Sequence, residues 1–548
     1  MHTVTRQGAA FGRTVAVGAL LAFLAIPAVG DPGSARGKGR VSQMLEEVAR
    51  AVDPDAAVPV IVQTETEPTP GHFARLHRIG GAVKGRHTAF SGYSATLPAA
   101  RILELAEDPE VGHMSLDVPV RTVLDVASLA VRADMAAVDS GDLDGSGIGV
   151  AVVDTGVQLH RDLARMGRRN GVVEVEIVGS EKGLADYFGH GTAVAGVING
   201  NGLASSDSDA FRTFRGLAPG ARLFSLRALQ ADGTGRASDV ILAIDWVIRN
   251  AHRQNIRVLN LSLGHPVYES YSTDPLCQAA AAAVRAGIVV VVSAGNGGRL
   301  GSGFGTITSP GNHPDVITVG AMDDNDTAAL EDDILAPYSA KGPTLVDYVV
   351  KPDLVGPGTF IVSLRATNSW IDRNHPESIL PLTDYKNARG LDWMVGEYTM
   401  LSGTSLAAPL VSAAAALMLQ REPGLSPATV KARLMASAAK DERMVFETGA
   451  GYLDVAAALQ QGSEASVAPS PTATIEADGT VTLQDTVLLW GGKWQQGLIW
   501  GNRKPVLQRI LTENDQITAT GLVWGGSAAR TMDEVEMVES FGLVWGGN

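Results

Sequence analysis

The sequence predicts an α/β fold, with an open, doubly wound and mostly parallel sheet at its centre. Two further parts flank this sheet: a small α+β unit before it and a short repeat-bearing extension after it. From Gly147 onward, short apolar runs alternate with helical stretches. Unbroken apolar runs are typical of parallel strands buried on both faces, and the helices between them predict crossover connections. The 548 residues, 45% hydrophobic and 19% charged, match a globular chain of several units.

The charge and the cysteine content exclude some classes of protein. A formal net charge of -15 argues against nucleic acid or an anionic membrane as a partner, because both attract basic patches. Cys277 is the single cysteine, so a disulfide within the chain is excluded. Cys277 precedes an alanine-rich helical stretch, and we expect a buried small side chain there rather than a reactive thiol.

The first 30 residues are expected to be a signal peptide. Arg6 and Arg13 form a basic start, residues 14–26 are apolar, and small residues at 28–30 suit cleavage. The apolar run is too short to span a bilayer comfortably, and no later run reaches about 18 apolar residues. We therefore expect an exported protein, secreted or associated with the cell surface, whose mature chain does not span a membrane.

Residues 31–57 begin with a Gly- and charge-rich stretch and are expected to be a linker. Residues 58–121 are expected to form the small α+β unit. Its expected elements are two strands and two helices, at 58–63, 93–97, 71–79 and 99–106. This unit by itself shows no residues that predict chemistry.

Residues 122–461 are expected to form the unit that holds the parallel sheet. Its expected strands lie at 149–153, 222–226, 257–263, 287–292 and 316–319, and helices are expected at 237–251 and 277–286. In open α/β sheets, ligands bind outside the carboxyl ends of the strands. Polar residues that follow these strands are therefore the candidates for a site.

Asp154 ends the first of these strands and begins an Asp-Thr-Gly sequence. Aspartic proteases carry this sequence, but they need two carboxylates from two lobes. The second candidate, Asp139, lies only 15 positions earlier, which is too close for a separate lobe. For a calcium loop beginning at Asp142, Val153 stands at the twelfth position, where a bidentate Glu is required, so a turn before the next strand is the better account. The remaining interpretation is that Asp154 belongs to a Ser/His/Asp triad.

Candidates for the other members of the triad lie at glycine-flanked helix starts. His190 lies in Gly-His-Gly-Thr, and Ser405 lies in Ser-Gly-Thr-Ser before an alanine-rich helix. A Ser at a helix N-terminus has a backbone N–H, and the positive end of the helix dipole, directed at an oxyanion on its substrate. Asn296 follows an apolar strand and would extend a side-chain amide into the same cleft. Each motif alone is weak, but all four occur at positions where an α/β sheet exposes side chains.

The order Asp, His, Asn, Ser along the chain is that of the subtilisins. Residues 131–459 resemble the subtilisin-like serine proteases, also called subtilases or the peptidase S8 family. Further matching segments are His160–Leu163, Phe214–Ala221, Asn260–Gly264, Ser309–Gly311, Lys351–Leu354, Ser426–Lys431 and Gly449–Val455. The unit at 58–121 resembles the inhibitory propeptide (inhibitor I9) of this family.

This resemblance implies a secreted serine endopeptidase that is made as a self-processing precursor. It implies that Ser405 attacks the scissile carbonyl, that His190 transfers the proton, and that Asp154 orients the imidazole. Asn296 and the backbone N–H of Ser405 would bind the oxyanion. Protein or peptide chains would be the substrates, and the propeptide would be an intramolecular inhibitor. The chemistry requires no cofactor.

The resemblance also implies residues that bind the substrate. Those that would pair with an extended substrate chain are Ser262, Leu263, Gly264, Ala294 and Gly295. Thr308 stands where the family often has Gly at the floor of the P1 pocket, which predicts a preference for a smaller P1 side chain. A 44-residue insertion between Gly358 and Gly403, holding Trp370, Tyr385 and Trp393, is expected near the cleft.

The presence of a structural calcium ion stays open. By resemblance, Asp162 would be a calcium ligand. A surface Asp whose hydrogen bonds are satisfied by other groups explains this residue about equally well. The segment 199–212 does not match a known calcium loop.

Residues 462–480 are Ser-, Ala- and Pro-rich and are expected to be a linker to the extension at 481–548. In this extension a Leu-Leu/Ile/Val-Trp-Gly-Gly/Asn theme occurs four times, starting at Leu488, Leu498, Leu522 and Leu543. Exposed Trp rings could dock to a surface partner, or the Trp residues could form a small core; the two interpretations are about even.

Two other functions fit the same residues. A peptide ligase or cyclase would pass the acyl group to an amine instead of water, depending on how well the cleft excludes water. A catalytically silent binding protein is disfavoured by the intact set of triad and oxyanion residues.

Overall fold

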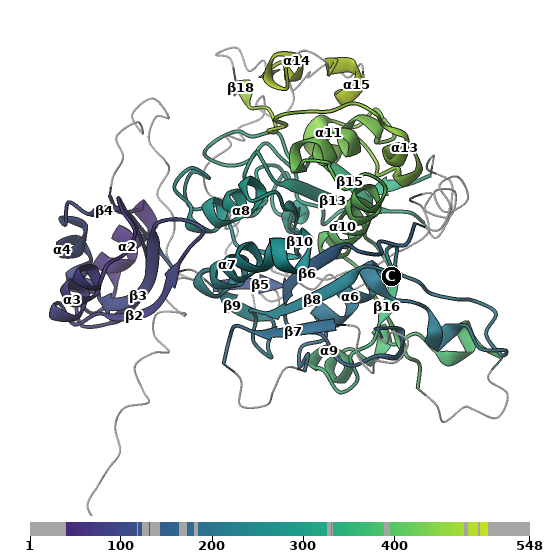
Figure 1. The fold of residues 1–548 in the computed structure, drawn as a ribbon, viewed down its shortest axis with the longest axis horizontal. Helices are drawn as coiled ribbons and strands as arrows, with labels where there is room; N and C mark the ends of the chain where they lie inside the picture. Colours follow the sequence, from purple (N-terminus) through teal and green to yellow (C-terminus); the bar gives the residue numbers. More distant parts are fainter. Residues whose placement is uncertain are drawn as a thin grey trace, which may run out of the picture.

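The computed structural model describes residues 40–117, 119–122, 131, 143–163, 172–179, 185–325, 330, 332–387, 395–475, 481–491 and 494–501. The expected signal peptide, Trp393 and the third and fourth repeats lie outside these residues. Figure 1 shows a small N-terminal unit at the left of a larger central unit, with the C-terminal segment along the top of the larger one. Within the part of the chain described, no helix is long and apolar enough to cross a membrane.

The N-terminal unit is a four-stranded antiparallel sheet with the strand order β2-β3-β1-β4. Its strands are β1 (Ala57–Thr64), β2 (Ala82–His87), β3 (Gly92–Pro98) and β4 (Val111–Leu116), and its helices are α2 (Gln43–Ala51), α3 (Pro70–Arg78) and α4 (Ile102–Ala106). Leu76 and Ile102 from the helices are buried in one core with β1. The sequence predicted β1, β3, α3 and the helix before β4, and missed the other strands.

Helix α2 corrects the prediction that residues 31–57 are a linker. Leu45 and Val48 of this helix are fully buried in the core of the N-terminal unit, and the Ser42 side chain caps its first turn. A nine-residue helix is marginal in isolation and is stabilised by packing, so local sequence gives only a weak signal. The folded N-terminal unit therefore begins near Arg40.

The central unit contains an eight-stranded sheet in the order β14-β13-β12-β10-β6-β8-β7, with β15 also paired to β13. Every pairing is parallel except that between β13 and β14. The strands are β6 (Gly149–Asp154), β7 (Val172–Glu176), β8 (Arg222–Arg227), β10 (Ile256–Leu261), β12 (Val289–Ser293), β13 (Ile317–Asp323), β14 (Ile334–Leu335) and β15 (Leu354–Pro357). This confirms the predicted fold class.

Helices cover both faces of this sheet (Figure 1). On β6, Val150 and Val152 belong to the core formed with α6 (His190–Asn199) and α10 (Thr404–Arg421). Ala151 and Val153 point to the opposite face, into the core formed with α7 (Ala237–Gln254) and α8 (Pro275–Arg285). Alternate strand residues thus serve two cores, which is why the runs read as continuously apolar.

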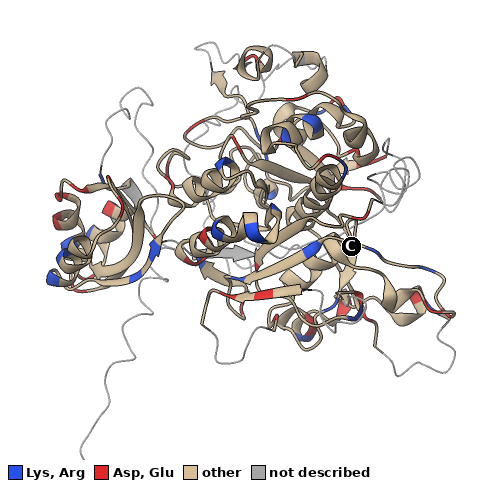
Figure 2. Cartoon of the chain, viewed as in Figure 1, with Lys and Arg blue, Asp and Glu red and all other residues tan. Residues whose placement is uncertain are grey.

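The N-terminal unit docks on the face that α7 and α8 cover. Asp245 of α7 accepts hydrogen bonds from the backbone N–H groups of Thr88 (2.7 Å) and Ala89 (2.5 Å). Lys84 forms an ion pair with Asp239 at 3.0 Å. Figure 2 shows basic and acidic residues intermixed over the N-terminal unit. Its strand β5 (Pro119–Thr122) continues onto the central unit.

The C-terminal segment corrects the prediction that residues 462–480 are a linker. Ser470 donates to Asp353 at 2.5 Å and accepts from Lys431 at 2.7 Å, and both partners are fully buried in the central unit. Trp490 and Trp500 are each 2% exposed and share a core with Met435 and Phe446. The remaining elements here are α11 (Pro427–Ser437), α12 (Val445–Thr448), α13 (Val455–Gln460), β18 (Ala473–Ile475), β19 (Val481–Leu483), α14 (Thr486–Leu489) and α15 (Gln496–Trp500).

The burial of Trp490 and Trp500 decides between the two interpretations of the repeats that they belong to. Both rings contribute to a core, so docking to a partner through exposed Trp rings is wrong for the first two repeats. The small Ser, Ala and Pro residues read as a linker because their composition favours loops, but here they pack closely over the surface of the central unit.

Candidate active site

Asp154 and His190 lie side by side because β6 ends where α6 begins. His190 Nδ1 is 2.7 Å from Asp154 Oδ1, and both side chains are buried. Gly189 has a φ of 110°, which L side chains rarely adopt. A Cβ atom on Gly191 would lie 2.1 Å from the carbonyl oxygen of Gly156. The two glycines that flank His190 therefore permit its close approach to the end of β6.

Ser405 lies in the first turn of α10, the helix that packs beside α6. Its Oγ donates a long hydrogen bond of 3.4 Å to the carbonyl oxygen of Ser262, and Ser262 Oγ donates to the carbonyl oxygen of Ser405 at 2.6 Å. The N-terminus of an 18-residue helix therefore lies directly at the Ser405 side chain.

Asn296 follows β12 and is oriented by Thr404, the residue before Ser405. Asn296 Oδ1 accepts hydrogen bonds from the backbone N–H of Thr404 at 3.1 Å and from Thr404 Oγ1 at 3.0 Å. These donors fix the oxygen, so the amide nitrogen points the other way. This Nδ2 is buried and has no acceptor among the described residues. A buried donor without a partner is costly and suits a site that an incoming oxygen completes.

An extended segment already lies along the predicted substrate-binding edge. Strand β5 lies between β11 (Leu263–Gly264) and β9 (Thr234–Arg236) in an antiparallel three-stranded sheet. Leu263 pairs with Thr122, and Gly264 pairs with Arg121. The end of the N-terminal unit therefore binds where a substrate chain is expected to bind by strand addition.

Thr308 lies between the two expected edges of the P1 pocket. A Cβ on Gly264 would be 2.7 Å from Thr308 Oγ1, and a Cβ on Gly295 would be 2.8 Å from Thr308 Cγ2. Thr308 N donates to the carbonyl oxygen of Ala294 at 3.0 Å. The structure thus brings together the residues that the sequence assigned to this pocket.

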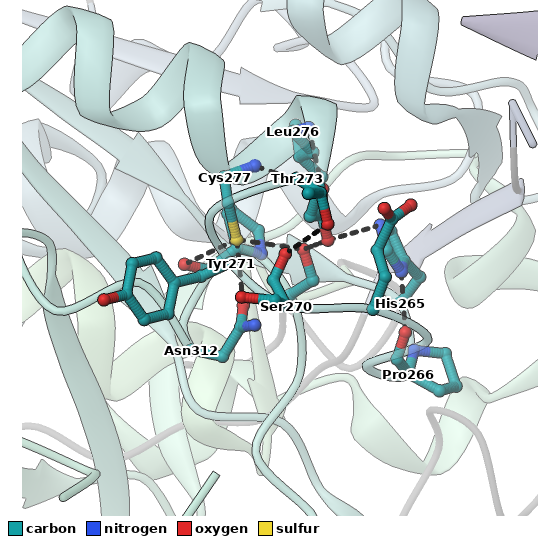
Figure 3. Close-up of polar contacts among 12 residues, drawn as sticks. His265, Pro266, Ser270, Tyr271, Thr273, Leu276, Cys277 and Asn312 are labelled. Carbon is teal, nitrogen blue, oxygen red and sulfur yellow. Dashed lines mark hydrogen bonds and ion pairs between the residues drawn. The ribbon is translucent and has the colours of Figure 1, made fainter. Parts of the chain in front are cut away.

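A buried polar cluster around Cys277 supports the segment that follows Thr308 (Figure 3). Cys277 Sγ is 3.0 Å from Asn312 Oδ1, and Ser309 Oγ donates to Asp274 at 2.6 Å. Burial, followed by the nearby charge of Asp274, raises the pKa of the Cys277 thiol well above its usual value. Cys277 is therefore buried, as the sequence predicted.

The insertion between Gly358 and Gly403 contacts the turn before His190. The Trp370 ring stacks on Phe188 with a centroid distance of 5.4 Å, and the backbone N–H of Trp370 donates to the carbonyl oxygen of Tyr187 at 2.7 Å. This contact confirms that the insertion lies near the cleft. Its further elements are β16 (Ile361–Leu364), α9 (Trp370–Asn374) and β17 (Tyr398–Leu401).

Asp162 is not on the surface, and protein groups bind both of its oxygens. Its carboxylate accepts hydrogen bonds from the backbone N–H of Ala204 at 2.6 Å and from Tyr398 Oη at 2.6 Å. Within the described ranges, no group of three or more His, Cys, Asp or Glu side chains is arranged to hold a metal ion. The fold itself supplies the partners of Asp162.

A family model described as the subtilase family, Peptidase S8, matches residues 145–451. The chain belongs to the subtilase family. This subtilase is 37% identical to the serine protease AprX of Bacillus subtilis (strain 168) over 356 residues, covering 64% of this chain and 74% of AprX. It is 31% identical to subtilisin E of the same organism over 384 residues, covering 70% of this chain and 84% of subtilisin E. It is accordingly a serine endopeptidase of the subtilisin type.

A solved structure shows the same fold. The crystal structure of fervidolysin from Fervidobacterium pennivorans, a keratinolytic enzyme related to subtilisin, matches this subtilase with a TM-score of 0.57 and 21% sequence identity. The match covers 78% of this chain and 67% of fervidolysin. At this identity the likeness concerns the fold.

Sequence reasoning missed three residues that shape this subtilase's site. Thr404 orients the Asn296 amide, and Thr155 contacts Asp154 directly. Each is adjacent in sequence to a predicted triad residue, so adjacency was the available signal. The third residue, Asp186, lies close to His190 in the sequence but 31 positions from Thr155, its partner at the end of β6.

Proposed function

We propose that this subtilase is a secreted endopeptidase that matures by cutting its own chain, with Asp154, His190 and Ser405 as its triad. Ser405 Oγ attacks the scissile carbonyl carbon while His190 takes its proton, and Asp154 stabilises the resulting imidazolium. The tetrahedral intermediate collapses, His190 protonates the leaving amine, and water then hydrolyses the acyl-enzyme by the same steps.

The single observation that supports this mechanism best is the buried, unpaired Nδ2 of Asn296. An oxyanion hole needs a fixed donor whose acceptor exists only during the reaction. Thr404 fixes the amide, and the donor atom has no acceptor among the described residues. The backbone N–H of Ser405 at the start of α10 would be the second donor.

The strand β5 supports the proposal of self-processing and inhibition by the propeptide. It pairs with β11 and β9 through its backbone, so the end of the N-terminal unit occupies the cleft of its own chain. Thr308 between Gly264 and Gly295 supports a preference for small P1 side chains. A signal peptide at residues 1–30, secretion and any association with the cell surface remain proposals from the sequence.

A Ser405→Ala precursor tests this proposal. We expect it to keep its N-terminal unit when purified alone and to resist labelling by a fluorophosphonate, because both reactions need the Ser405 hydroxyl. Ser412→Ala is the matched control, since Ser412 is another buried serine of α10, and it donates to Asn260. We expect this control to mature. A Ser405→Ala chain that still matured alone would show that another protease makes the cut.

A further inference from the structure

Asp186 is a buried carboxylate that accepts four hydrogen bonds. Its Oδ1 accepts from the backbone N–H of Gly189 at 2.7 Å and from Thr155 Oγ1 at 2.9 Å. Its Oδ2 accepts from the backbone N–H of Thr192 at 2.8 Å and from Thr192 Oγ1 at 2.7 Å. Burial raises the pKa of Asp186, while these four donors oppose the rise by favouring the ionised form.

The donors come from the two elements that supply Asp154 and His190. Thr155 directly follows Asp154 at the end of β6, while Gly189 and Thr192 lie on either side of His190 at the start of α6. One carboxylate therefore ties the end of the strand to the beginning of the helix. These hydrogen bonds therefore help to fix the position of the His190 imidazole relative to Asp154.

The Thr155 hydroxyl has one proton and two carboxylates within reach. Its Oγ1 lies 2.9 Å from Asp186 Oδ1 and 3.2 Å from Asp154 Oδ1, and it accepts a hydrogen bond from the backbone N–H of Gly191 at 2.9 Å. Because its contact is the shorter one, Asp186 rather than Asp154 accepts the hydrogen bond from this hydroxyl. Asp154 Oδ1 is then left with the Thr155 backbone N–H (2.7 Å) and His190 Nδ1 (2.7 Å).

We infer that Asp186 is a positioning residue for catalysis. It accepts the hydrogen bond that the Thr155 hydroxyl donates, so that the negative charge of Asp154 stays available to the His190 imidazolium. Asp154 Oδ2 is buried and has no hydrogen-bond partner among the described residues, so this charge is not shared with other donors there. The inference rests on the proposed roles of Asp154 and His190. It adds that Asp186 keeps the Thr155 hydroxyl from donating to Asp154.

Asp186→Asn tests this inference. A neutral amide oxygen accepts more weakly than a carboxylate, so the Thr155 hydroxyl would turn to Asp154 Oδ1. Asp154 would then stabilise the imidazolium less. We expect kcat to fall about 10- to 100-fold, by analogy with the loss of hydrogen-bond partners that orient metal-binding side chains, with KM changed less than about threefold. The acid-limb midpoint of kcat/KM should move to lower pH by about half a unit or more.

Two substitutions of Thr155 distinguish an extra hydrogen bond to Asp154 from the loss of the hydrogen bond that links β6 to α6. Thr155→Val removes the hydroxyl, so the hydrogen bond to Asp186 is lost, but Asp154 gains no extra donor. We expect a lower kcat with an unmoved acid-limb midpoint. Thr155→Ser keeps the hydroxyl and should stay close to the wild type in both quantities. This pair also keeps the inference testable if Asp186→Asn folds poorly.

Every variant would be matured by a trace of wild-type enzyme, repurified, titrated for active sites and checked for its Tm. Asp162→Asn is the matched control, because Asp162 is also a buried carboxylate bound by a backbone N–H and a hydroxyl. We expect Asp162→Asn to lower the Tm without moving the pH profile. The inference is overturned if Asp186→Asn leaves kcat within about twofold and the midpoint unmoved, or if Thr155→Val moves the midpoint as Asp186→Asn does. Asp154→Asn with unchanged activity would instead overturn the proposed triad.

Discussion

At the scale of single residues, the candidate site depends on donors and acceptors that neighbouring residues orient. Thr404 holds the oxygen of Asn296, and Asp186 holds the hydroxyl of Thr155. In both cases the hydroxyl of a residue beside a candidate reactive residue takes part in the hydrogen bond that fixes the orientation. Such an arrangement costs no reorganisation at the moment of reaction, which is the advantage of a preorganised site.

Asn296→Ala should lower kcat by about 10²–10³ with little change in KM, because the amide acts only once negative charge develops on the substrate. Steady-state kinetics on a short peptide would measure this. Thr404→Val should give a smaller loss, because the backbone N–H of Thr404 still holds Asn296 Oδ1. A change confined to KM would mean instead that Asn296 binds the ground-state substrate.

At the scale of elements, β5 extends an otherwise separate docking interface into the cleft. The sheet of the N-terminal unit meets α7 through Asp245, and His113 of β4 lies 2.8 Å from Glu269. These contacts position the unit, whereas β5 alone pairs with β9 and β11. Docking and occupation of the cleft are therefore separable.

We expect the isolated segment 40–122 to inhibit the mature enzyme, and the segment 40–117, which lacks β5, to inhibit at least tenfold more weakly. Each lost backbone hydrogen bond contributes about 0.5–1.5 kcal/mol, and tenfold corresponds to about 1.4 kcal/mol. Inhibition constants on a peptide substrate would measure this difference. Asp245→Ala in the enzyme is the control for docking alone and should weaken both segments equally. Equal inhibition by the two segments would show that β5 contributes nothing to binding.

At the scale of the whole molecule, the C-terminal segment is part of the packed structure. Ser470 closes a buried cluster in which Lys351 lies 2.7 Å and Lys431 lies 3.1 Å from Asp353. The Trp490 ring covers the same side and donates to the carbonyl oxygen of Pro469 at 2.7 Å. Ending the chain after Gln461 would therefore expose this cluster.

Trp490→Ala should lower the free energy of unfolding by about 3–5 kcal/mol, the usual cost of removing a buried Trp side chain. Leu488→Ala is the matched control from the same repeat, because Leu488 is 82% exposed, and it should have little effect. Denaturant unfolding would measure both. The kcat/KM of folded Trp490→Ala should stay within about threefold, since the ring packs with residues such as Met435 and Phe446 rather than at the cleft. Equal stability of the two variants would mean that the segment is not part of the cooperative fold.

The buried cluster also predicts a pH dependence. Burial and then the neighbouring Lys431 lower the pKa of Lys351 to about 7, although Asp353 opposes this. Between this value and the ordinary lysine pKa, the unfolded chain binds more protons than the folded chain, so this group's contribution to stability rises with pH. The stability of the wild type relative to Lys351→Met should therefore increase from pH 7 to pH 10, by up to about 1.4 kcal/mol per unit. Unfolding curves at several pH values would measure this. If Lys351 stays charged, the difference in the free energy of unfolding between the two proteins would not change with pH.

The central sheet and the candidate reactive residues could be predicted from the sequence alone. Buried parallel strands require continuous apolar runs, and Asp154, His190, Asn296 and Ser405 lie in short motifs at the ends of strands and the starts of helices. These signals are local, so they can be read along the chain.

Which groups distant in the sequence meet depends on the tertiary structure. Helix α2 and the segment around Ser470 looked like linkers, because nothing in their local composition shows the cores that they join. Asp162 looked like a surface residue or a calcium ligand until Tyr398, far along the chain, proved to be its partner. Asp186 was missed because its hydrogen bond to Thr155, 31 positions away in the sequence, forms only when β6 and α6 come together. Long-range packing and the orientation of hydrogen bonds depend on the folded geometry, and no window of sequence contains that information.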